Sequence, residues 1–244
     1  MSRDLVSIDD LADDELMALL DVAEEMARGL RARTTALHGV ILATLFLEPS
    51  TRTRLSFEAA MHRLGGSVIT SADPATSSTV KGETLVDTIR MVDGYADVIV
   101  LRHSAAGAAH VAAEVARAPV INAGDGGREH PTQTLVDLFT LRRECGQLSG
   151  LTVMLYGDLR FGRTTHSLAR GLVRLGARII ALAEPELGLP EYVQDGLRAR
   201  GDVSIREVEI DGLGPAFGGP RLARVIEPAG RAGSGGSLRL GKGE

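Results

Sequence analysis

Residues 40–54, VILATLFLEPSTRTR, decide the fold of this chain. The apolar run VILATLFL at 40–47 is typical of a strand that is buried on both faces, as in a parallel sheet. A polar turn at 48–51 leads directly into a helix that we expect to end at Gly65 and Gly66. A buried strand followed at once by a helix predicts a βα unit, the repeating element of α/β proteins.

The same alternation continues on both sides of this unit. An amphipathic helix is expected before it, at 14–29. Further helices are expected at 83–93, 105–117, 131–144, 163–175 and 190–200, and further strands at 67–70, 97–101, 120–122, 151–156, 178–183 and 203–208. Strands that alternate with helices predict right-handed crossovers and parallel sheets. We therefore expect the α/β class, with two open parallel-sheet α/β domains, the second of them incomplete.

The best domain boundary is Gly146–Gly150, after which the alternation starts again. We predict a first domain at 1–145, a partial second domain at 146–211 and a Gly-rich irregular tail at 212–244. The tail contains ten glycines and three prolines and has no amphipathic period. It fits either a flexible terminal segment or a chain that is truncated or read out of frame after about residue 211.

The composition argues against several classes of protein. The 244 residues include 27 Lys and Arg against 32 Asp and Glu, so no basic excess points to nucleic acid. No apolar run approaches the length of a membrane-spanning helix, and the acidic N-terminus does not resemble a secretory signal. The lone Cys145 can form neither an internal disulfide nor a multi-cysteine zinc site. We therefore expect a cytoplasmic protein with no membrane or nucleic-acid partner.

The residues Ser50, Thr51, Arg52, Thr53 and Arg54 lie where the buried strand gives way to a helix. A helix N-terminus offers unpaired backbone N–H groups and a partial positive charge. Hydroxyl groups add donors, and the planar guanidinium group suits phosphate oxygens. The pattern favours a phosphate site. The alternative is an ordinary N-cap with the arginines in solvent.

A second polar cluster, DGGREHPTQ at 125–133, follows another expected strand. His130 and Gln133 share a face of the first helical turn, where the imidazole can donate to an oxygen and the amide can accept from an amino group. Arg102 directly follows the strand at 97–101. Ligands of open parallel sheets bind at such carboxyl ends of strands. The alternatives are a surface turn with a capping histidine and a solvated arginine.

Two further segments carry polar residues. GDLRFGRTTH at 157–166 follows an expected strand, and Arg163 at the start of the next helix can receive a carboxylate. This segment lacks the G-x-G-x-x-G spacing, which argues against a nucleotide-binding α/β protein. The loop at 75–83 contains Lys81 and by itself fits a mobile loop with a solvated lysine.

Five motifs together resemble one known family. They are FLEPSTRTRLSFEAA at 46–60, VKGETLVDTI at 80–89, VLRH at 100–103, NAGDGGREHPTQTLVDLFTL at 122–141 and YGDLRFGRTTHSL at 156–168. In order and spacing they are similar to the catalytic chain of the aspartate/ornithine carbamoyltransferase family over about residues 1–210. The ornithine branch shares the S-x-R-T-R and H-P-x-Q themes, whereas the segment around Arg163 resembles the aspartate branch.

The resemblance implies where carbamoyl phosphate would bind, in a first domain that would be the carbamoyl-phosphate-binding domain. Its phosphate would be held by Ser50, Thr51, Arg52 and Thr53. Its carbonyl oxygen would be held by Thr53, Arg102 and His130, and its amino group by Gln133. Among these residues, the resemblance implies that the catalytic ones are Arg52, Thr53, Arg102 and His130.

The resemblance also implies partners. Arg163, in the partial aspartate-binding domain, would bind a carboxylate of aspartate. Ser77 and Lys81 would reach into the active site of a neighbouring subunit of a homotrimer. The resemblance allows a regulatory or companion chain, and it implies neither a cofactor nor a metal.

The implied activity is transfer of the carbamoyl group of carbamoyl phosphate to the amine of L-aspartate, giving N-carbamoyl-L-aspartate and phosphate for pyrimidine biosynthesis. Such a site must orient two anions and stabilise developing negative charge, which suits cationic and hydroxyl donors. The D-V-L-Y-x-T-R-x-Q and H-P-L-P motifs that the family carries further along the chain do not occur in this sequence. The alternative function is a catalytically impaired homologue that binds carbamoyl phosphate or acts as a structural partner subunit.

Overall fold

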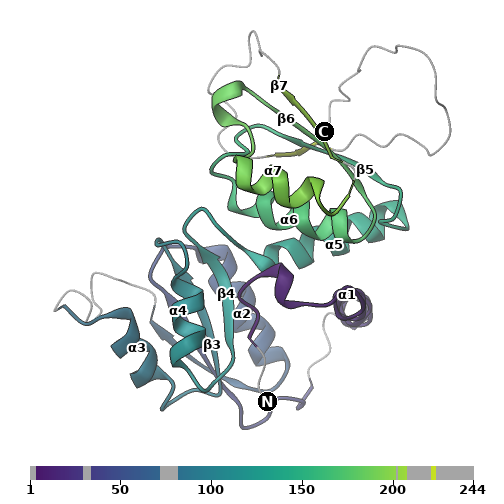
Figure 1. Ribbon diagram of the computed structural model, residues 1–244. Helices are drawn as coiled ribbons and strands as arrows, with labels where there is room; N and C mark the ends of the chain where they lie inside the picture. Colours follow the sequence, from purple (N-terminus) through teal and green to yellow (C-terminus); the bar gives the residue numbers. More distant parts are fainter. Residues whose placement is uncertain (1–3, 30–33, 72–81, 202, 208–220, 224–244) are drawn as a thin grey trace, which may run out of the picture.

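The computed structural model of the chain describes residues 4–29, 34–71, 82–201, 203–207 and 221–223. These residues form two four-stranded sheets with helices packed against them (Figure 1). Every described strand pairing is parallel except the one made by the last strand. The structure therefore confirms the predicted α/β class with two open parallel-sheet units.

The first sheet has the strand order β2-β1-β3-β4. Its strands are β1 (Ile41–Phe46), β2 (Ser67–Ser71), β3 (Val98–His103) and β4 (Val120–Asp125). In the interior of this sheet Leu42 lies opposite both Val68 and Val98. Five of the six residues of β1 are buried, as expected for an apolar strand covered on both faces.

Helices cover both faces of the first sheet. They are α2 (Thr51–Arg63), α3 (Leu85–Val92) and α4 (Ala108–Val115). Met61 of α2 packs with Phe46 in one core, whereas Ile89 of α3 and Ala112 of α4 pack with Leu45 in another. Because side chains alternate along a strand, adjacent residues of β1 enter opposite cores.

The second sheet has the strand order β7-β6-β5-β8. Its elements are β5 (Thr152–Tyr156), α6 (Arg163–Arg174), β6 (Arg178–Ala183), η3 (Pro185–Leu187), α7 (Glu191–Arg198), β7 (Val203–Glu207) and β8 (Arg221–Ala223). β8 pairs antiparallel with β5, and it lies within the segment that we expected to be an irregular tail. The other residues of 212–244 lie outside the described part of the chain.

The two sheets fall on either side of the predicted boundary, but their cores do not divide there. Three elements from the first 145 residues contribute to the core of the second sheet. They are η1 (Ile8–Asp10), α1 (Asp13–Arg28) and α5 (Pro131–Cys145). They place Ile8, Leu16 and Leu138 in the same core as Leu155 of β5. The division into domains at 1–145 and 146–211 therefore stays a prediction.

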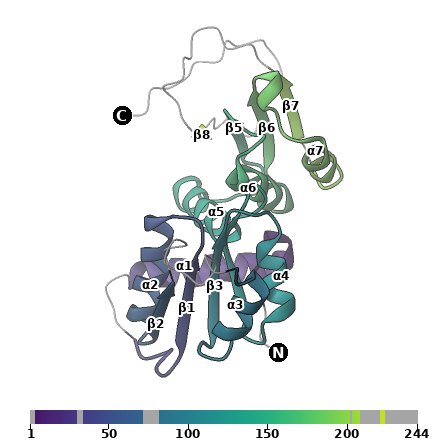
Figure 2. The same cartoon turned by 90° about the vertical axis from the view of Figure 1, so that its left-hand side faces the viewer.

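The junction between the two sheets positions the candidate site. Figure 2 shows α5 and α6 lying between the sheets. α2, α5 and α6 begin after the carboxyl ends of β1, β4 and β5 respectively. The first turns of α2 and α5 therefore lie at the carboxyl edge of the first sheet and that of α6 at the carboxyl edge of the second, the edges where ligands of parallel sheets bind.

Candidate functional site

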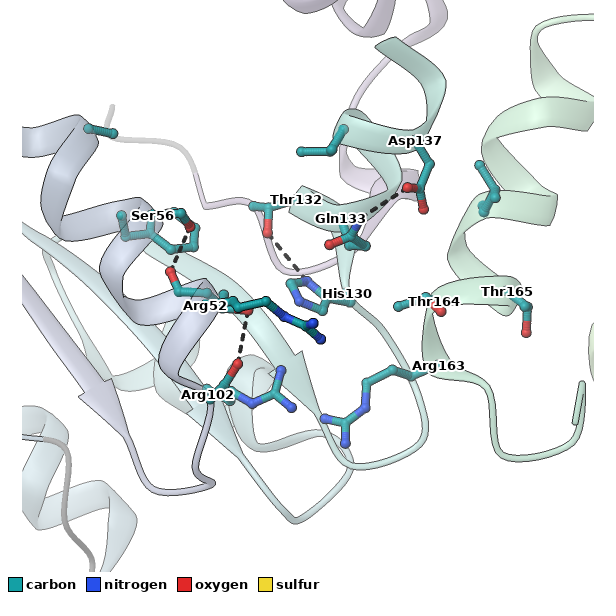
Figure 3. Close-up of a pocket in the computed structure, with 16 residues that line it drawn as sticks. Arg52, Ser56, Arg102, His130, Thr132, Gln133, Asp137, Arg163, Thr164 and Thr165 are labelled. Carbon is teal, nitrogen blue, oxygen red and sulfur yellow. Dashed lines mark hydrogen bonds between the residues drawn. The ribbon is translucent and has the colours of Figure 1, made fainter. Parts of the chain in front are cut away.

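A cavity of about 910 Å³ lies where the first turns of α2, α5 and α6 meet (Figure 3). Its lining residues are Ser50, Arg52, Thr53, Ser56, Phe57, Ala60, Arg102, His130, Thr132, Gln133, Val136, Asp137, Arg163, Thr164, Thr165 and Leu168. In Figure 3 the guanidinium groups of Arg52, Arg102 and Arg163 point toward the same region as the His130 ring. The cavity therefore gathers cationic and neutral hydrogen-bond donors from both sheet units.

Three helix N-termini face this cavity without the usual caps. The N-cap residues are Ser50 for α2, His130 for α5 and Gly162 for α6, and none of their side chains makes a capping hydrogen bond. None of these described helices has an acidic residue in its first turn. The Ser50 Oγ instead donates to the Thr53 Oγ1, 3.0 Å away. The positive helix ends thus face an anion in the cavity, and at the start of α2 the backbone N–H groups are also available to it, whereas those of Gln133, Arg163 and Thr165 donate to carbonyl oxygens.

One carboxylate, Glu48, joins arginines from the two sheet units. It accepts a hydrogen bond from Arg102 Nη2 at 2.5 Å and bonds from Arg163 Nη2 and Nη1 at 2.9 and 3.3 Å. Arg102 Nη1 donates to the carbonyl oxygen of Ala123 at 3.0 Å. The Arg102 Nε is buried and has no hydrogen-bond partner among the described residues. A buried donor left unpaired is uncommon and marks this guanidinium group as a candidate for ligand binding.

The His130 ring is held in its neutral form. Burial, followed by the charges of Arg102 and Arg163, lowers the pKa of His130 to about 4, while Glu48 opposes this shift. The Thr132 Oγ1 lies 3.3 Å from the His130 Nδ1. The donor in this contact depends on the tautomer, and in either tautomer the neutral ring carries one N–H donor. His130 is then a neutral hydrogen-bond donor at neutral pH.

Acid should destabilise the protein through His130. The unfolded chain binds a proton near pH 6.5, whereas folded His130 stays neutral down to about pH 4. Between these values the unfolded state holds more protons, so the free energy of unfolding should fall by up to about 3 kcal/mol as the pH is lowered. Urea denaturation at a series of pH values measures this slope.

The variant His130→Asn isolates this contribution. Burial also lowers the pKa of His166, which adds to the slope in the same direction and is kept in the variant. We expect the variant to lose less stability than the wild type over this pH window. Equal slopes in the two proteins would contradict the assignment of a depressed pKa to His130.

Gly124 lets Arg102 and Arg163 approach the end of β4. It has a φ of +113°, and a Cβ built on it would lie 2.7 Å from Arg102 Nη1 and 3.2 Å from Arg163 Nη1. Both the backbone conformation and the space therefore favour glycine here.

The substitution Gly124→Ala should both destabilise the fold and weaken anion binding. The strained φ should cost about 1–3 kcal/mol in the free energy of unfolding. Displacement of the Arg102 guanidinium group should weaken binding of carbamoyl phosphate by about tenfold or more, as expected for the loss of a charge-assisted hydrogen bond. Thermal unfolding and calorimetric titration with carbamoyl phosphate measure the two effects. A matched control is Gly196→Ala, because this position is helical and a Cβ there meets no atom within 4 Å. If the Gly124 variant behaved like this control, the role of Gly124 in making room for the two arginines would be refuted.

The structure brings together most of the residues that the sequence singled out. Seven of them line the cavity: Ser50, Arg52, Thr53, Arg102, His130, Gln133 and Arg163. Thr51 is the first residue of α2, but it is exposed and does not line the cavity. Ser77 and Lys81 lie outside the described residues.

Sequence reasoning missed the two carboxylates of this region. Asp137 lies one helical turn after Gln133, whose Nε2 donates to the Asp137 Oδ1 at 2.9 Å (Figure 3). Spacing by four residues on a predicted helix is a signal that could have found it. Glu48 stands in the polar turn after β1, but its contact with Arg163 depends on how the two sheet units are placed.

No group of three or more His, Cys, Asp or Glu side chains in the described ranges could hold a metal ion. Over the same ranges, no helix is long and apolar enough to cross a membrane.

Residues 3–143 match the family model described as "Aspartate/ornithine carbamoyltransferase, carbamoyl-P binding domain". The chain is also 53% identical over 214 residues to the aspartate carbamoyltransferase catalytic subunit of Thermoplasma acidophilum, covering 87% of this chain and 69% of that protein. The chain belongs to the aspartate/ornithine carbamoyltransferase family. A second family member, the catalytic subunit from Thermococcus gammatolerans, is 50% identical over 216 residues, covering 87% of this chain and 70% of that protein. The chain thus spans about two thirds of the length of these relatives.

Solved structures of aspartate transcarbamoylases share the fold of this family member. The catalytic subunit from M. jannaschii aligns with a TM-score of 0.78 at 47% identity, covering 84% of this chain and 68% of that one. The Trypanosoma cruzi enzyme in complex with carbamoyl phosphate and aspartate aligns with a TM-score of 0.80 at 39% identity, covering 84% and 67%. The same enzyme with carbamoyl aspartate and phosphate gives 0.80 at 41% identity, covering 85% and 69%. The family resemblance predicted from the five motifs is confirmed.

Proposed function

We propose that this chain transfers the carbamoyl group of carbamoyl phosphate to the amine of L-aspartate, giving N-carbamoyl-L-aspartate and phosphate for pyrimidine biosynthesis. The observation that carries the proposal is the convergence of Arg52, Arg102, Arg163 and His130 on one cavity at three uncapped helix N-termini. Complexes of the Trypanosoma cruzi enzyme with both substrates and with both products support this choice of reaction.

The phosphate group binds at the start of α2. The backbone N–H groups of the first turn, the hydroxyls of Ser50 and Thr53 and the Arg52 guanidinium supply its donors. Thr51 takes part through its place in the same turn, since its side chain does not line the cavity. Arg52 is exposed, so its side chain can swing onto a phosphate without first breaking a buried contact.

The carbonyl oxygen binds between Thr53, Arg102 and His130. The amine of aspartate attacks the carbonyl carbon and a C–N bond forms. The bond from that carbon to the phosphate oxygen breaks, and the departing phosphate takes up the proton that the amine loses. Negative charge grows first on the carbonyl oxygen and then on the departing phosphate. Donors already fixed around that oxygen stabilise the charge, because they need little reorganisation as the reaction proceeds. The neutral His130 acts as such a donor and forms no covalent intermediate.

Arg163 binds a carboxylate of aspartate from the second sheet unit. Its guanidinium group shares Glu48 with Arg102, so the carboxylate site and the carbonyl site lie next to each other. This arrangement brings the attacking amine and the carbonyl carbon together, which is the main contribution that a site without a covalent nucleophile can make.

The assembly and the compartment are part of the proposal. A homotrimer in which Ser77 and Lys81 complete the site of a neighbouring subunit follows from the family resemblance, and a regulatory or companion chain is compatible with it. The lone Cys145 fits the reducing cytoplasm.

Light scattering on the purified chain measures the oligomeric state. An equimolar mixture of Lys81→Ala and Arg102→Ala chains tests whether active sites are shared between subunits. Activity in the mixture above that of either variant alone is expected for shared sites.

Sequential calorimetry tests the proposed reaction. Carbamoyl phosphate is titrated first, and then succinate, a non-reacting dicarboxylate, is titrated into the complex. Binding of both, together with formation of N-carbamoyl-L-aspartate when aspartate replaces succinate, is the expected result. Binding of carbamoyl phosphate alone would favour the catalytically impaired homologue. Absence of carbamoyl phosphate binding would overturn the proposal.

A further inference from the structure

Gln133 and Asp137 form a hydrogen-bonded pair on the cavity wall. They lie one turn apart on α5, and the Gln133 Nε2 donates to the Asp137 Oδ1 at 2.9 Å (Figure 3). Both residues line the cavity. The pair therefore belongs to the candidate site, and the mechanism above gives Asp137 no role.

An ionised carboxylate restricts the orientation of this glutamine. It can only accept hydrogen bonds, so the Gln133 amide must turn its NH₂ group toward Asp137. The opposite end of the amide is then the carbonyl oxygen Oε1. Within the described part of the chain, no protein group donates a hydrogen bond to this oxygen.

A fixed acceptor is unusual in the surroundings of Gln133. The neighbouring side chains that line the cavity are chiefly donors, among them Arg52, Arg102 and Arg163. Such groups bind phosphate and carbonyl oxygens, but they cannot accept a hydrogen bond from an N–H group. The Gln133 Oε1 supplies a neutral acceptor among these donors.

We propose that Asp137 is a positioning residue that holds the Gln133 carbonyl oxygen ready to accept a hydrogen bond from the amino group of carbamoyl phosphate. This inference rests on the proposed function and adds the basis of its selectivity. Acetyl phosphate carries a methyl group in place of the amino group and leaves the oxygen without a donor. A site that holds a polar group for one substrate discriminates against an analogue that leaves this group unpaired. Asp137 therefore sets the preference for carbamoyl over acetyl phosphate.

The variant Asp137→Asn tests the proposal with almost no change in shape. Asparagine can accept or donate, so the Gln133 amide is free to adopt either orientation. Burial raises the pKa of Asp137, while the hydrogen bond from Gln133 opposes this shift. Calorimetry is therefore done at about pH 8, which favours the carboxylate, and gives the affinities for carbamoyl phosphate and acetyl phosphate. We expect the affinity for carbamoyl phosphate to fall by about five- to tenfold, and that for acetyl phosphate to change by less than about twofold.

Two further variants serve as controls. Asp137→Glu keeps a carboxylate that only accepts, and it should retain most of the preference for carbamoyl phosphate. Asp195→Asn makes the same chemical change on the exposed face of α7 and should leave both affinities unchanged. Circular dichroism verifies that each variant is folded.

The outcomes separate this inference from the proposed function. An equal loss of affinity for both phosphates in Asp137→Asn, or no loss for either, would overturn the positioning role and leave the proposed reaction standing. Failure of the wild-type chain to bind carbamoyl phosphate would overturn both.

Discussion

The substitution Arg102→Ala should lower the rate of carbamoyl transfer by about 10²–10³-fold, the usual cost of removing one donor that stabilises a developing oxyanion. Arg102 lies near the carboxyl end of β3 and is fixed by Glu48 and by the carbonyl oxygen of Ala123. Its buried Nε is unpaired among the described residues. The same loss or more is expected for Arg52→Ala.

Steady-state kinetics on the purified chain measures this effect. Arg102→Lys keeps the positive charge but not the planar fork, so its rate should lie between those of the wild type and the alanine variant. Arg28→Ala is the matched control, because the Arg28 side chain is 76% exposed at the end of α1, far from the cavity. A near-normal rate for Arg102→Ala in a folded protein would show that the assigned role is wrong.

The substitution Glu129→Ala should destabilise the protein by about 3–5 kcal/mol, the expected cost of leaving a buried charge without its partner. Glu129 is 1% exposed and forms an ion pair with Arg170 of α6. It also accepts hydrogen bonds from Ser167 Oγ at 2.8 Å and from Ser7 Oγ at 3.3 Å. This one carboxylate therefore ties the segment before α5 to α6 and to the N-terminal segment.

Urea denaturation of two variants tests this role. The single variant Glu129→Ala leaves Arg170 largely buried without its main partner. In the double variant Glu129→Leu/Arg170→Met both charges are replaced by apolar groups, and most of the lost stability should return. A loss below about 1 kcal/mol in the single variant would indicate that the pair is as weak as an exposed ion pair.

The loss of Glu129 should also weaken substrate binding at the cavity. The Ser167 Oγ that donates to Glu129 accepts a hydrogen bond from the backbone N–H of His130 at 3.1 Å. The same network thus holds the start of α5 against α6, which carries Arg163. Stability and substrate affinity should therefore fall together in the single variant.

Local patterns were enough to predict the first sheet and most of the site. The apolar run at 40–47 has the composition of an interior strand, and β1 is one. Arg102, His130 and Arg163 each follow the end of a predicted strand, and parallel strands bring such positions to one edge. The convergence of Arg102 and His130 follows from the topology of the first sheet, whereas Arg163 follows β5 of the second sheet and reaches the cavity through the placement of the two units.

Other features depend on the placement of distant segments. Glu48 contacts Arg163 only because the second sheet unit lies over the end of β1. Leu16 of α1 enters the core of the second sheet, which no pattern within α1 reveals. β8 arises in a segment rich in glycine and proline, where local propensity gives no signal for a strand and pairing with β5 supplies it.

A crystal structure of the chain with carbamoyl phosphate tests the central claim most directly. The account predicts phosphate oxygens within hydrogen-bond distance of Arg52 and the first backbone N–H groups of α2, and the carbonyl oxygen between Arg102 and His130. Its amino group should face the Gln133 carbonyl oxygen. A ligand bound elsewhere, or one whose phosphate contacts neither Arg52 nor α2, would contradict the account.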